Sequence, residues 1–212
     1  MLWIKRFVFL MALLPIAMCQ AQQEKYQAGV HYEVLPQTVR TADAKKIEIN
    51  EIFSYTCGHC YNFEAVVQPW KEQLSADIDF QRTPALWSSA LEPYARAYYA
   101  ALMLNALDQV HMPIFEAIHL KRQRLSSEQD FAEIFVSAGI DGDKFSKAYN
   151  SFGMTSMVNQ AKARVRSYRT QGTPEIIVNG KYRVSTAKSG GFSGMLSVAD
   201  FLIQKERDLI AK

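Results

Sequence analysis

The strongest restriction on the fold of this 212-residue chain comes from two cysteines, Cys57 and Cys60, that stand where the character of the sequence changes. Before them, residues 45–55 ("KKIEINEIFSY") alternate charged and apolar side chains and end in Ile52 and Phe53, which predicts a strand entering a core. After them, apolar side chains recur every three or four residues and predict one buried helix face: Phe63, Val66, Val67, Trp70 and Leu74. Cys57 is therefore expected at, or just before, a helix N-terminus.

That position has chemical consequences for Cys57. The first backbone N–H groups of a helix lack intrahelical partners, and the helix dipole is positive at this end. Both effects stabilise a thiolate, so the pKa of Cys57 is expected to lie below the value of about 8.5 for a free cysteine.

A metal site, a structural disulfide and a redox-active pair can all use two cysteines at this spacing. Structural zinc takes four ligands, and His31, His111 and His119 do not stand at ligand spacing from the pair. A disulfide that closes so short a loop removes little entropy from the unfolded chain, on the order of 2 kcal/mol or less. The redox function is favoured, and no metal is expected.

Residues 1–21 have the features of a secretory signal. Lys5 and Arg6 precede an apolar run at 7–17, and small residues then follow at a spacing that a signal peptidase accepts. We expect cleavage before Gln22. The alternative is an uncleaved membrane anchor, for which this apolar run is short.

Cleavage changes both the cysteine count and the charge. It removes Cys19 and leaves Cys57 and Cys60 in an exported protein, where disulfides persist. The chain has 24 Lys and Arg against 21 Asp and Glu, and loss of Lys5 and Arg6 leaves a net charge of +1. This balance argues against a nucleic-acid partner.

The remaining sequence predicts a mixed α/β protein. Residues 78–86 indicate a second strand, and 91–169 are helical in character, with one long helix expected over 94–107. A hairpin follows, with strands at 176–178 and 182–184. Its Asn179-Gly180 turn is a strong local signal. Two helix ends are expected, a capping box of Ser126 with Gln129 and a C-terminal cap at Gly172. A final amphipathic helix is expected at 197–210.

Two stretches together resemble a known family. Residues 51–64 ("EIFSYTCGHCYNFE") and 172–182 ("GTPEIIVNGKY") are similar to the active-site strand and helix, and to the second active-site loop, of the bacterial periplasmic DsbA family. The resemblance implies a thioredoxin-like fold with an inserted all-helical subdomain. It places the thioredoxin-like part in 22–86 and 171–212, and the helical subdomain in 87–170.

The resemblance assigns roles around the cysteines. Cys57 corresponds to the exposed nucleophile and Cys60 to its buried partner, with His59 between them favouring the Cys57 thiolate. Pro174 corresponds to a cis-proline that faces the disulfide, and Thr173 offers backbone atoms to a bound peptide.

Other positions match or depart from the family pattern. Glu51 matches a buried acid beneath the active site, and Glu64 and Arg82 match a companion acid and a base. We expect Glu51 to be protonated, hydrated or paired with a base such as Arg82, because a lone buried carboxylate is costly. Gly58 stands where the best-known members have proline, and Thr173 where they usually have valine. Both departures bear on redox strength.

The implied activity is disulfide donation in the periplasm. Reduced, newly exported proteins would be the substrates, and a quinone-linked membrane protein similar to DsbB would reoxidise the enzyme. The chemistry needs no cofactor, and we expect a monomer.

Three alternatives remain open from the sequence. A disulfide isomerase or reductase of the same compartment would use the same cysteines in the reduced state. An enzyme like glutathione transferase or 2-hydroxychromene isomerase shares the helical insertion but leaves the cysteine pair unexplained. A peptide-binding holdase would keep its function after a Cys57→Ser substitution.

Overall fold

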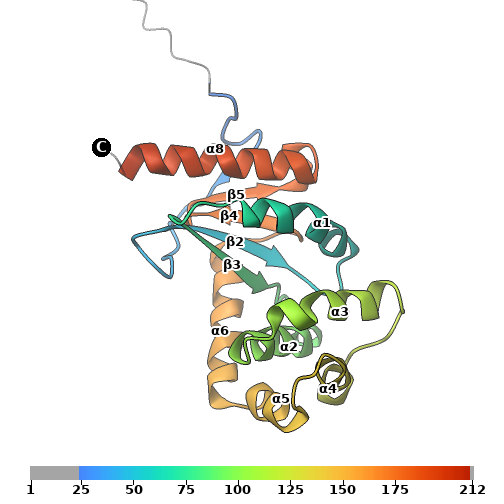
Figure 1. The fold of residues 1–212 in the computed structure, drawn as a ribbon. Helices are drawn as coiled ribbons and strands as arrows, with labels where there is room; N and C mark the ends of the chain where they lie inside the picture. The colour runs from blue at the N-terminus through green and yellow to red at the C-terminus, as the bar shows by residue number, and fades with distance from the viewer. Residues whose placement is uncertain (1–23, 211–212) are drawn as a thin grey trace, which may run out of the picture.

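The computed structural model describes residues 24–210 and contains a five-stranded mixed sheet (Figure 1). Its strands are β1 (Glu33–Val34), β2 (Ile47–Phe53), β3 (Ile78–Pro84), β4 (Glu175–Val178) and β5 (Tyr182–Ser185). The spatial order is β1-β5-β4-β2-β3. Strands β2 and β3 run parallel, and the other neighbouring pairs run antiparallel.

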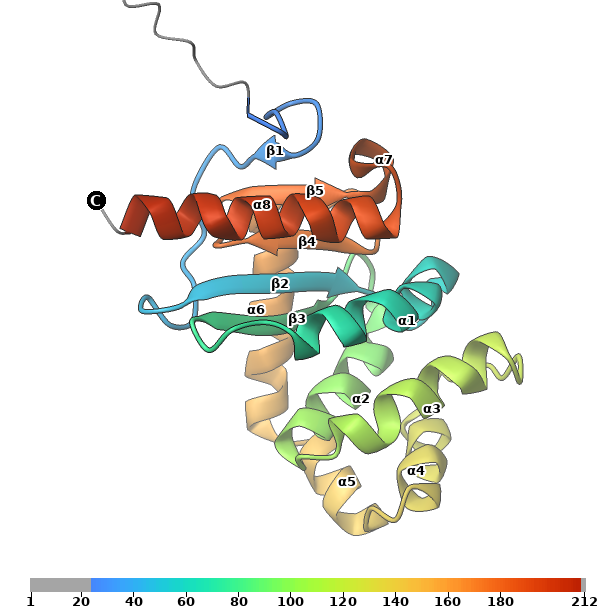
Figure 2. The same cartoon turned by 45° about the horizontal axis from the view of Figure 1, so that its top comes forward.

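Helices cover both faces of the sheet. Helices α1 (Gly58–Glu72) and α8 (Phe192–Ile210) lie in front of the strands in Figure 2, and α6 (Phe152–Ser167) lies behind them. Successive side chains of a strand point to opposite faces. Ile176 accordingly packs in the cluster with α1 and α8, whereas Ile177 packs with α6. Every residue of β2 is buried, in keeping with its place between β4 and β3 and under helices on both faces.

The remaining helices form a layer beyond β3. They are α2 (Glu92–Met103), α3 (Leu107–His119), α4 (Glu128–Ser137) and α5 (Gly142–Tyr149), with a 3-10 turn at Ser89–Leu91 before them. Their apolar faces share one core with the end of β2 and the start of α1. Members of that core from both sides are Phe53, Tyr55, Cys60, Phe115, Phe131 and Phe145. The cysteine pair thus stands where the sheet meets the helical layer.

The predicted hairpin is confirmed. Asn179 and Gly180 both have positive φ, at 50° and 62°, as a type I′ turn requires. Strand β1 was not predicted, because its two residues are too few to show a periodic pattern. A short helix α7 (Thr186–Ser189) follows the hairpin.

The prediction of one long helix over 94–107 is wrong. Helix α2 ends at Met103 and α3 begins at Leu107, and Asn105 between them has φ 52°. Asparagine tolerates this left-handed conformation better than most residues. The apolar spacing continues across the break, so periodicity alone does not reveal it.

Two predicted helix caps lie at other residues. The capping box of α4 uses Ser127 and Asp130, one residue beyond Ser126 and Gln129. Helix α6 ends at Ser167, well before Gly172, and Arg169 adopts the left-handed conformation with φ 50°. Its N–H donates to the Arg166 carbonyl and the Thr170 N–H to the Val165 carbonyl, which is a Schellman ending without glycine.

The expected secretory signal at 1–21 lies outside the described residues. Within residues 24–210, none of the helices combines the length and apolar character needed to cross a membrane.

Candidate active site

The first element of the site is the N-terminus of α1, which carries both cysteines. Cys57 is the N-cap residue in an extended conformation, with φ −94° and ψ 114°, and is partly buried. Cys60 lies in the first turn and is fully buried. Both carry free thiols. The predicted position of Cys57 is therefore confirmed.

The two thiols differ strongly in acidity. The pKa of Cys57 is lowered to about 5, first because the Cys60 thiol donates a hydrogen bond to the thiolate. The Thr173 hydroxyl and the backbone N–H groups of Cys60 and His59 add to this effect, and partial burial opposes it. The pKa of Cys60 is raised far above the ordinary thiol range, chiefly by burial and then by its hydrogen bond to Cys57.

The second element is the loop before β4. Its Thr173–Pro174 peptide bond is cis, as the resemblance implied. The Cys57 thiol donates to the Thr173 carbonyl at 3.3 Å, across 116 residues of sequence. The loop and the cysteine pair thus form one surface.

His59 and Gly58 lie at the exposed rim of this surface. The His59 contribution to the acidity of Cys57 comes from its backbone N–H, while its ring lies near Phe192, with centroids 6.5 Å apart. Gly58 is the first residue of α1, and a Cβ there would meet only the ring of His119, at 3.9 Å.

Beneath the cysteines lies a buried cluster of charge. Arg82 donates through Nε to Glu51 at 2.7 Å and through Nη2 to both oxygens of Glu64, at 3.0 and 3.1 Å. Glu51 and Arg82 are directly opposite each other on the parallel strands β2 and β3. The expected pairing of Glu51 with Arg82 is confirmed, and Glu64 and Arg82 are buried rather than ordinary surface charges.

The two acids of the cluster titrate in opposite directions. The pKa of Glu51 is raised to about 7, mainly by complete burial, which Arg82 only partly offsets. The pKa of Glu64 is lowered, because its bond to His111 and the charge of Arg82 outweigh burial. One oxygen of Glu51 has no hydrogen-bond partner among the described residues. Of the two acids, Glu51 is therefore the one whose pKa lies near neutrality.

Two histidines of α3 join the site, although sequence reasoning gave neither a role there. His111 is buried and hydrogen-bonded to the Tyr55 hydroxyl at 2.8 Å and to Glu64 at 3.2 Å. The His119 ring stacks on Tyr61, and its Nε2 donates to the Tyr55 carbonyl at 2.8 Å. Their spacing of eight residues places both on one face of α3, which was the available signal.

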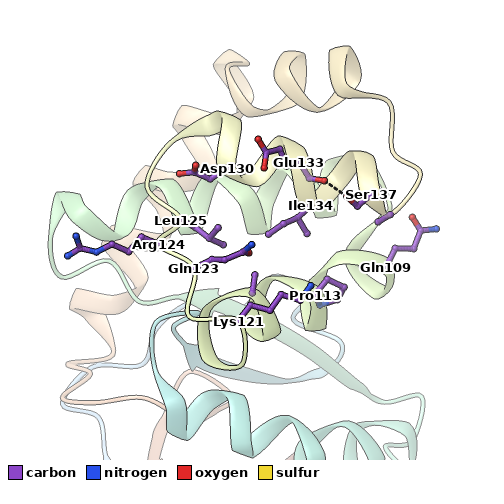
Figure 3. A pocket seen from close by; sticks show the side chains of 12 residues that line it. Gln109, Pro113, Lys121, Gln123, Arg124, Leu125, Asp130, Glu133, Ile134 and Ser137 are labelled. Atoms are coloured by element: carbon purple, nitrogen blue, oxygen red, sulfur yellow. Dashed lines mark hydrogen bonds between the residues drawn. The ribbon is translucent and has the colours of Figure 1, made fainter.

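Two hollows flank α3. One, of about 590 Å³, lies between α1 and α3, and its lining includes Glu64, Arg82 and His111. The other, of about 520 Å³, lies between α3 and α4 and is lined by residues such as Pro113 and Ile134 (Figure 3). The first hollow reaches the buried charge cluster, whereas the second contains none of the site residues described above.

Comparisons with known proteins identify one family for this chain. The family model for a DSBA-like thioredoxin domain matches residues 67–197. Among curated relatives, Thiol:disulfide interchange protein DsbA of Pseudomonas aeruginosa is 37% identical over 187 residues, which are 88% of this chain and 89% of the relative. The protein of the same name from Azotobacter vinelandii is 38% identical over 179 residues, 84% of each chain.

Solved structures show the same architecture. The crystal structure of Pseudomonas aeruginosa DsbA superposes with a TM-score of 0.86 at 36% identity, and covers 90% of this chain and 99% of its own. The oxidoreductase DsbA from Xylella fastidiosa has a TM-score of 0.81 at 33% identity, and covers 86% of this chain and 98% of its own.

Proposed function

The chain belongs to the DsbA family of thioredoxin-fold thiol:disulfide oxidoreductases, and we propose that Cys57 and Cys60 are its redox-active pair. The enzyme forms disulfide bonds in other proteins. The observation that carries the residue assignment is the placement of the two sulfurs: Cys57 is the partly exposed N-cap residue of α1, whereas Cys60 is buried in its first turn. The lowered pKa of Cys57 and the raised pKa of Cys60 support it. Only the acidic thiol is suited to accept and release a substrate sulfur.

The exchange proceeds in two steps from the oxidised enzyme. A substrate thiolate attacks the Cys57 sulfur, the bond to Cys60 breaks, and Cys60 leaves and gains a proton. A second substrate thiolate then attacks the substrate sulfur of the mixed disulfide, and Cys57 leaves as a thiolate. The substrate loses two electrons and the enzyme pair gains them. The low pKa of Cys57 makes it a good leaving group in the second step.

The loop before β4 is the proposed peptide-binding element. The Thr173 carbonyl lies 3.3 Å from the Cys57 sulfur, so backbone groups of this loop are in reach of a peptide bonded to that sulfur. Pro174 has no N–H to compete for those acceptors. His59 and Gly58 form the opposite rim of the same surface.

Glu51 is proposed to relay the proton that Cys60 gains when it leaves. Its pKa near neutrality allows either direction of transfer. Arg82 binds both Glu51 and Glu64, and Arg82 and Glu64 line the hollow between α1 and α3. The charges of Arg82 and Glu64 act on Glu51 in opposite directions: Arg82 lowers its pKa and Glu64 raises it.

The proposed location is the periplasm, reached through the secretory signal expected at 1–21. Reduced exported proteins are the proposed substrates, in keeping with the name of the relatives. A quinone-linked membrane protein similar to DsbB is the proposed reoxidant, because each turnover leaves the enzyme reduced.

A trapping experiment tests the cysteine assignment. Cys60→Ser is first charged with glutathione as a mixed disulfide at Cys57 and is then mixed with a peptide that carries one thiol. The peptide thiolate should displace glutathione, and the resulting Cys57–peptide disulfide should persist, because no Cys60 thiol is present to attack it. Cys57→Ser should form no such disulfide and should not oxidise a reduced substrate. Full oxidase activity in Cys57→Ser, or trapping through Cys60 alone, would contradict the proposal. A wild-type protein that oxidises no substrate, together with undiminished protection of an unfolded protein by Cys57→Ser, would favour the holdase.

A further inference from the structure

Glu175 is a buried acid that the thiol exchange does not use. It directly follows Pro174 as the first residue of β4, and only 3% of its surface is exposed. An unpaired buried carboxylate is costly, so its retention at this position calls for a physical reason.

The carboxylate turns back onto the peptide-binding loop. Its Oε1 accepts a hydrogen bond from the Gln171 N–H at 3.3 Å, which closes the segment 171–174 into a ring. Thr173 lies within that ring, and its carbonyl oxygen lies 3.3 Å from the Cys57 sulfur. The carboxylate is therefore attached to the backbone that faces the reacting sulfur.

The other oxygen of Glu175 has no hydrogen-bond partner in the described part of the chain. Two charged side chains face the carboxyl: Arg183 of β5 attracts it and Glu33 of β1 repels it. One Arg183 nitrogen binds Glu33 and another, Nη1, has no partner within residues 24–210, while Lys188 of α7 lies 3.1 Å from Glu33. Burial outweighs the attraction of Arg183 and raises the pKa of Glu175 to about 7.

We propose that Glu175 is a positioning residue whose ionised carboxylate fixes the loop 171–174 and so strengthens productive binding of substrate at Cys57. This inference rests on the proposed function of that loop. A hydrogen bond to a carboxylate is stronger than one to a neutral acid. Protonation on the other oxygen also places an O–H at an atom that has no hydrogen-bond partner within residues 24–210. The loop is thus held firmly above the titration of Glu175 and loosely below it.

The kinetic test compares wild type with Glu175→Gln, a neutral side chain of nearly the same shape. Both oxidise one reduced peptide across the neutral pH range, and the wild-type value of kcat/KM is divided by the variant value at each pH. This ratio cancels the titration of the peptide thiols. The ratio should be close to one at low pH and should rise about fivefold as the pH increases. A factor of this size corresponds to the difference in strength between a hydrogen bond to a charged group and one to a neutral group. The midpoint should lie near pH 7.

Glu206→Gln is the matched control. Glu206 is also buried and has one oxygen without a partner among the residues that the structure describes, but it binds Asn179 and Lys181 at the turn of the β4–β5 hairpin. Its ratio to wild type should not change with pH. A flat ratio for Glu175→Gln, or an equal change in both variants, would overturn the proposal.

A spectroscopic measurement keeps the proposal testable if Glu175→Gln folds poorly. In the wild-type protein without substrate, the amide proton resonance of Gln171 should shift with a midpoint near pH 7 as its acceptor titrates. A Gln171 resonance that does not titrate in this range would overturn the inference. Because no thiol exchange is measured, this result is independent of the proposed function.

Discussion

Cys57 and Cys60 are three residues apart, yet their surroundings give them opposite acidities. The pKa of Cys57 is lowered first by the nearby Cys60 thiol, and then by the Thr173 hydroxyl and the N–H groups at the start of α1. Cys60 is enclosed by the core that joins the sheet to the helical layer. At the scale of the single residue, the chemistry depends on which of the two sulfurs can carry a negative charge.

The first prediction concerns the acidity of Cys57. Ultraviolet thiolate absorbance of the reduced protein should be lost with a midpoint near pH 5, rather than near the ordinary value of 9. Because the folded-state pKa is lowered, the thiolate stabilises the reduced fold fully above pH 9, and this contribution is lost as pH falls through about 5. Urea unfolding of the reduced protein at several pH values, with Cys57→Ser as the control, measures it. A midpoint near that of free cysteine would refute this account.

The second prediction concerns Glu51. Glu51→Gln should slow release of Cys60 during mixed-disulfide formation on the order of 100-fold, the lower range for loss of a proton-transfer group. Alkylation of Cys57 in the reduced enzyme should be almost unchanged. Stopped-flow mixing of oxidised enzyme with a reduced peptide measures the first rate.

Glu48→Gln is the control for Glu51→Gln, because Glu48 is buried in the same strand but faces α6, where Arg164 binds it at 3.2 Å. It should leave both rates unchanged. The folded-state pKa of Glu51 is raised from 4.5 to about 7, so wild-type stability should fall as pH rises between these values. Equal slowing of both reactions by Glu51→Gln, or of neither, would count against a relay.

At the scale of elements, the backbone conformation at the start of α1 positions Cys57 and the N–H groups near its sulfur. Gly58 occupies the first helical position, where proline is well accommodated because that N–H has no intrahelical partner. Cys57 already has the extended backbone that a residue before proline requires. The N–H groups that stabilise the Cys57 thiolate belong to His59 and Cys60, and not to Gly58.

The third prediction follows for Gly58→Pro. The oxidised protein should gain about 0.5–1 kcal/mol in its free energy of unfolding, because proline reduces the freedom of the unfolded chain. Urea unfolding of both redox forms measures the gain, with Gly58→Ala as the matched variant. The lowered pKa of Cys57 should persist. A loss of stability would mean that the contact with His119 is tighter than 3.9 Å allows.

The fourth prediction concerns the N-terminus of α4. The Ser127 hydroxyl accepts from the Asp130 N–H, and Asp130 accepts from the Ser127 N–H, so Ser127→Ala removes half of a capping box. The expected cost is about 1 kcal/mol in thermal or urea unfolding. Ser126→Ala should cost less, because the bond from Ser126 to Asp130 uses its backbone N–H. A larger loss of stability in Ser126→Ala than in Ser127→Ala would support Ser126 as the N-cap residue, as the sequence predicted.

At the scale of the whole molecule, the sheet and the helical layer meet at the cysteine pair. The sheet supplies Cys57 with the loop of Thr173, and the helical layer supplies His111 and His119 of α3. Each half therefore contributes groups that the other lacks. The active site belongs to the assembled chain rather than to either part.

The fifth prediction separates disulfide donation from isomerisation. Stoichiometric oxidised enzyme should rapidly form disulfides in a fully reduced small protein, because the acidic Cys57 leaves readily from the mixed disulfide. Reduced enzyme should rescue a scrambled protein only slowly, and sedimentation should show a monomer. Efficient rescue by a dimeric species would identify an isomerase instead.

The sequence by itself determined the features that depend on neighbouring residues. The alternation of charged and apolar residues before Cys57 predicted the strand β2. The apolar spacing of three and four residues after it predicted α1, with Cys57 at its N-terminus. Asn179 and Gly180 fixed the hairpin turn, because few other residues adopt positive φ at low cost. The resemblance of two short stretches then supplied the family and the roles of Cys60 and Pro174.

Only the tertiary structure decided which charged residues are buried and with which partners. Glu51, Glu64 and Arg82 come from three elements, and the parallel register of β2 and β3 is what places Glu51 opposite Arg82. The spacing of His111 and His119 indicates a shared helix face but not the partner of His111, which is distant in sequence. The partner of Glu175 is a backbone group of the loop, for which no side-chain pattern is a signal. A buried charge is tolerated only when the folded chain places a partner beside it, and the local sequence does not show which residue that partner is.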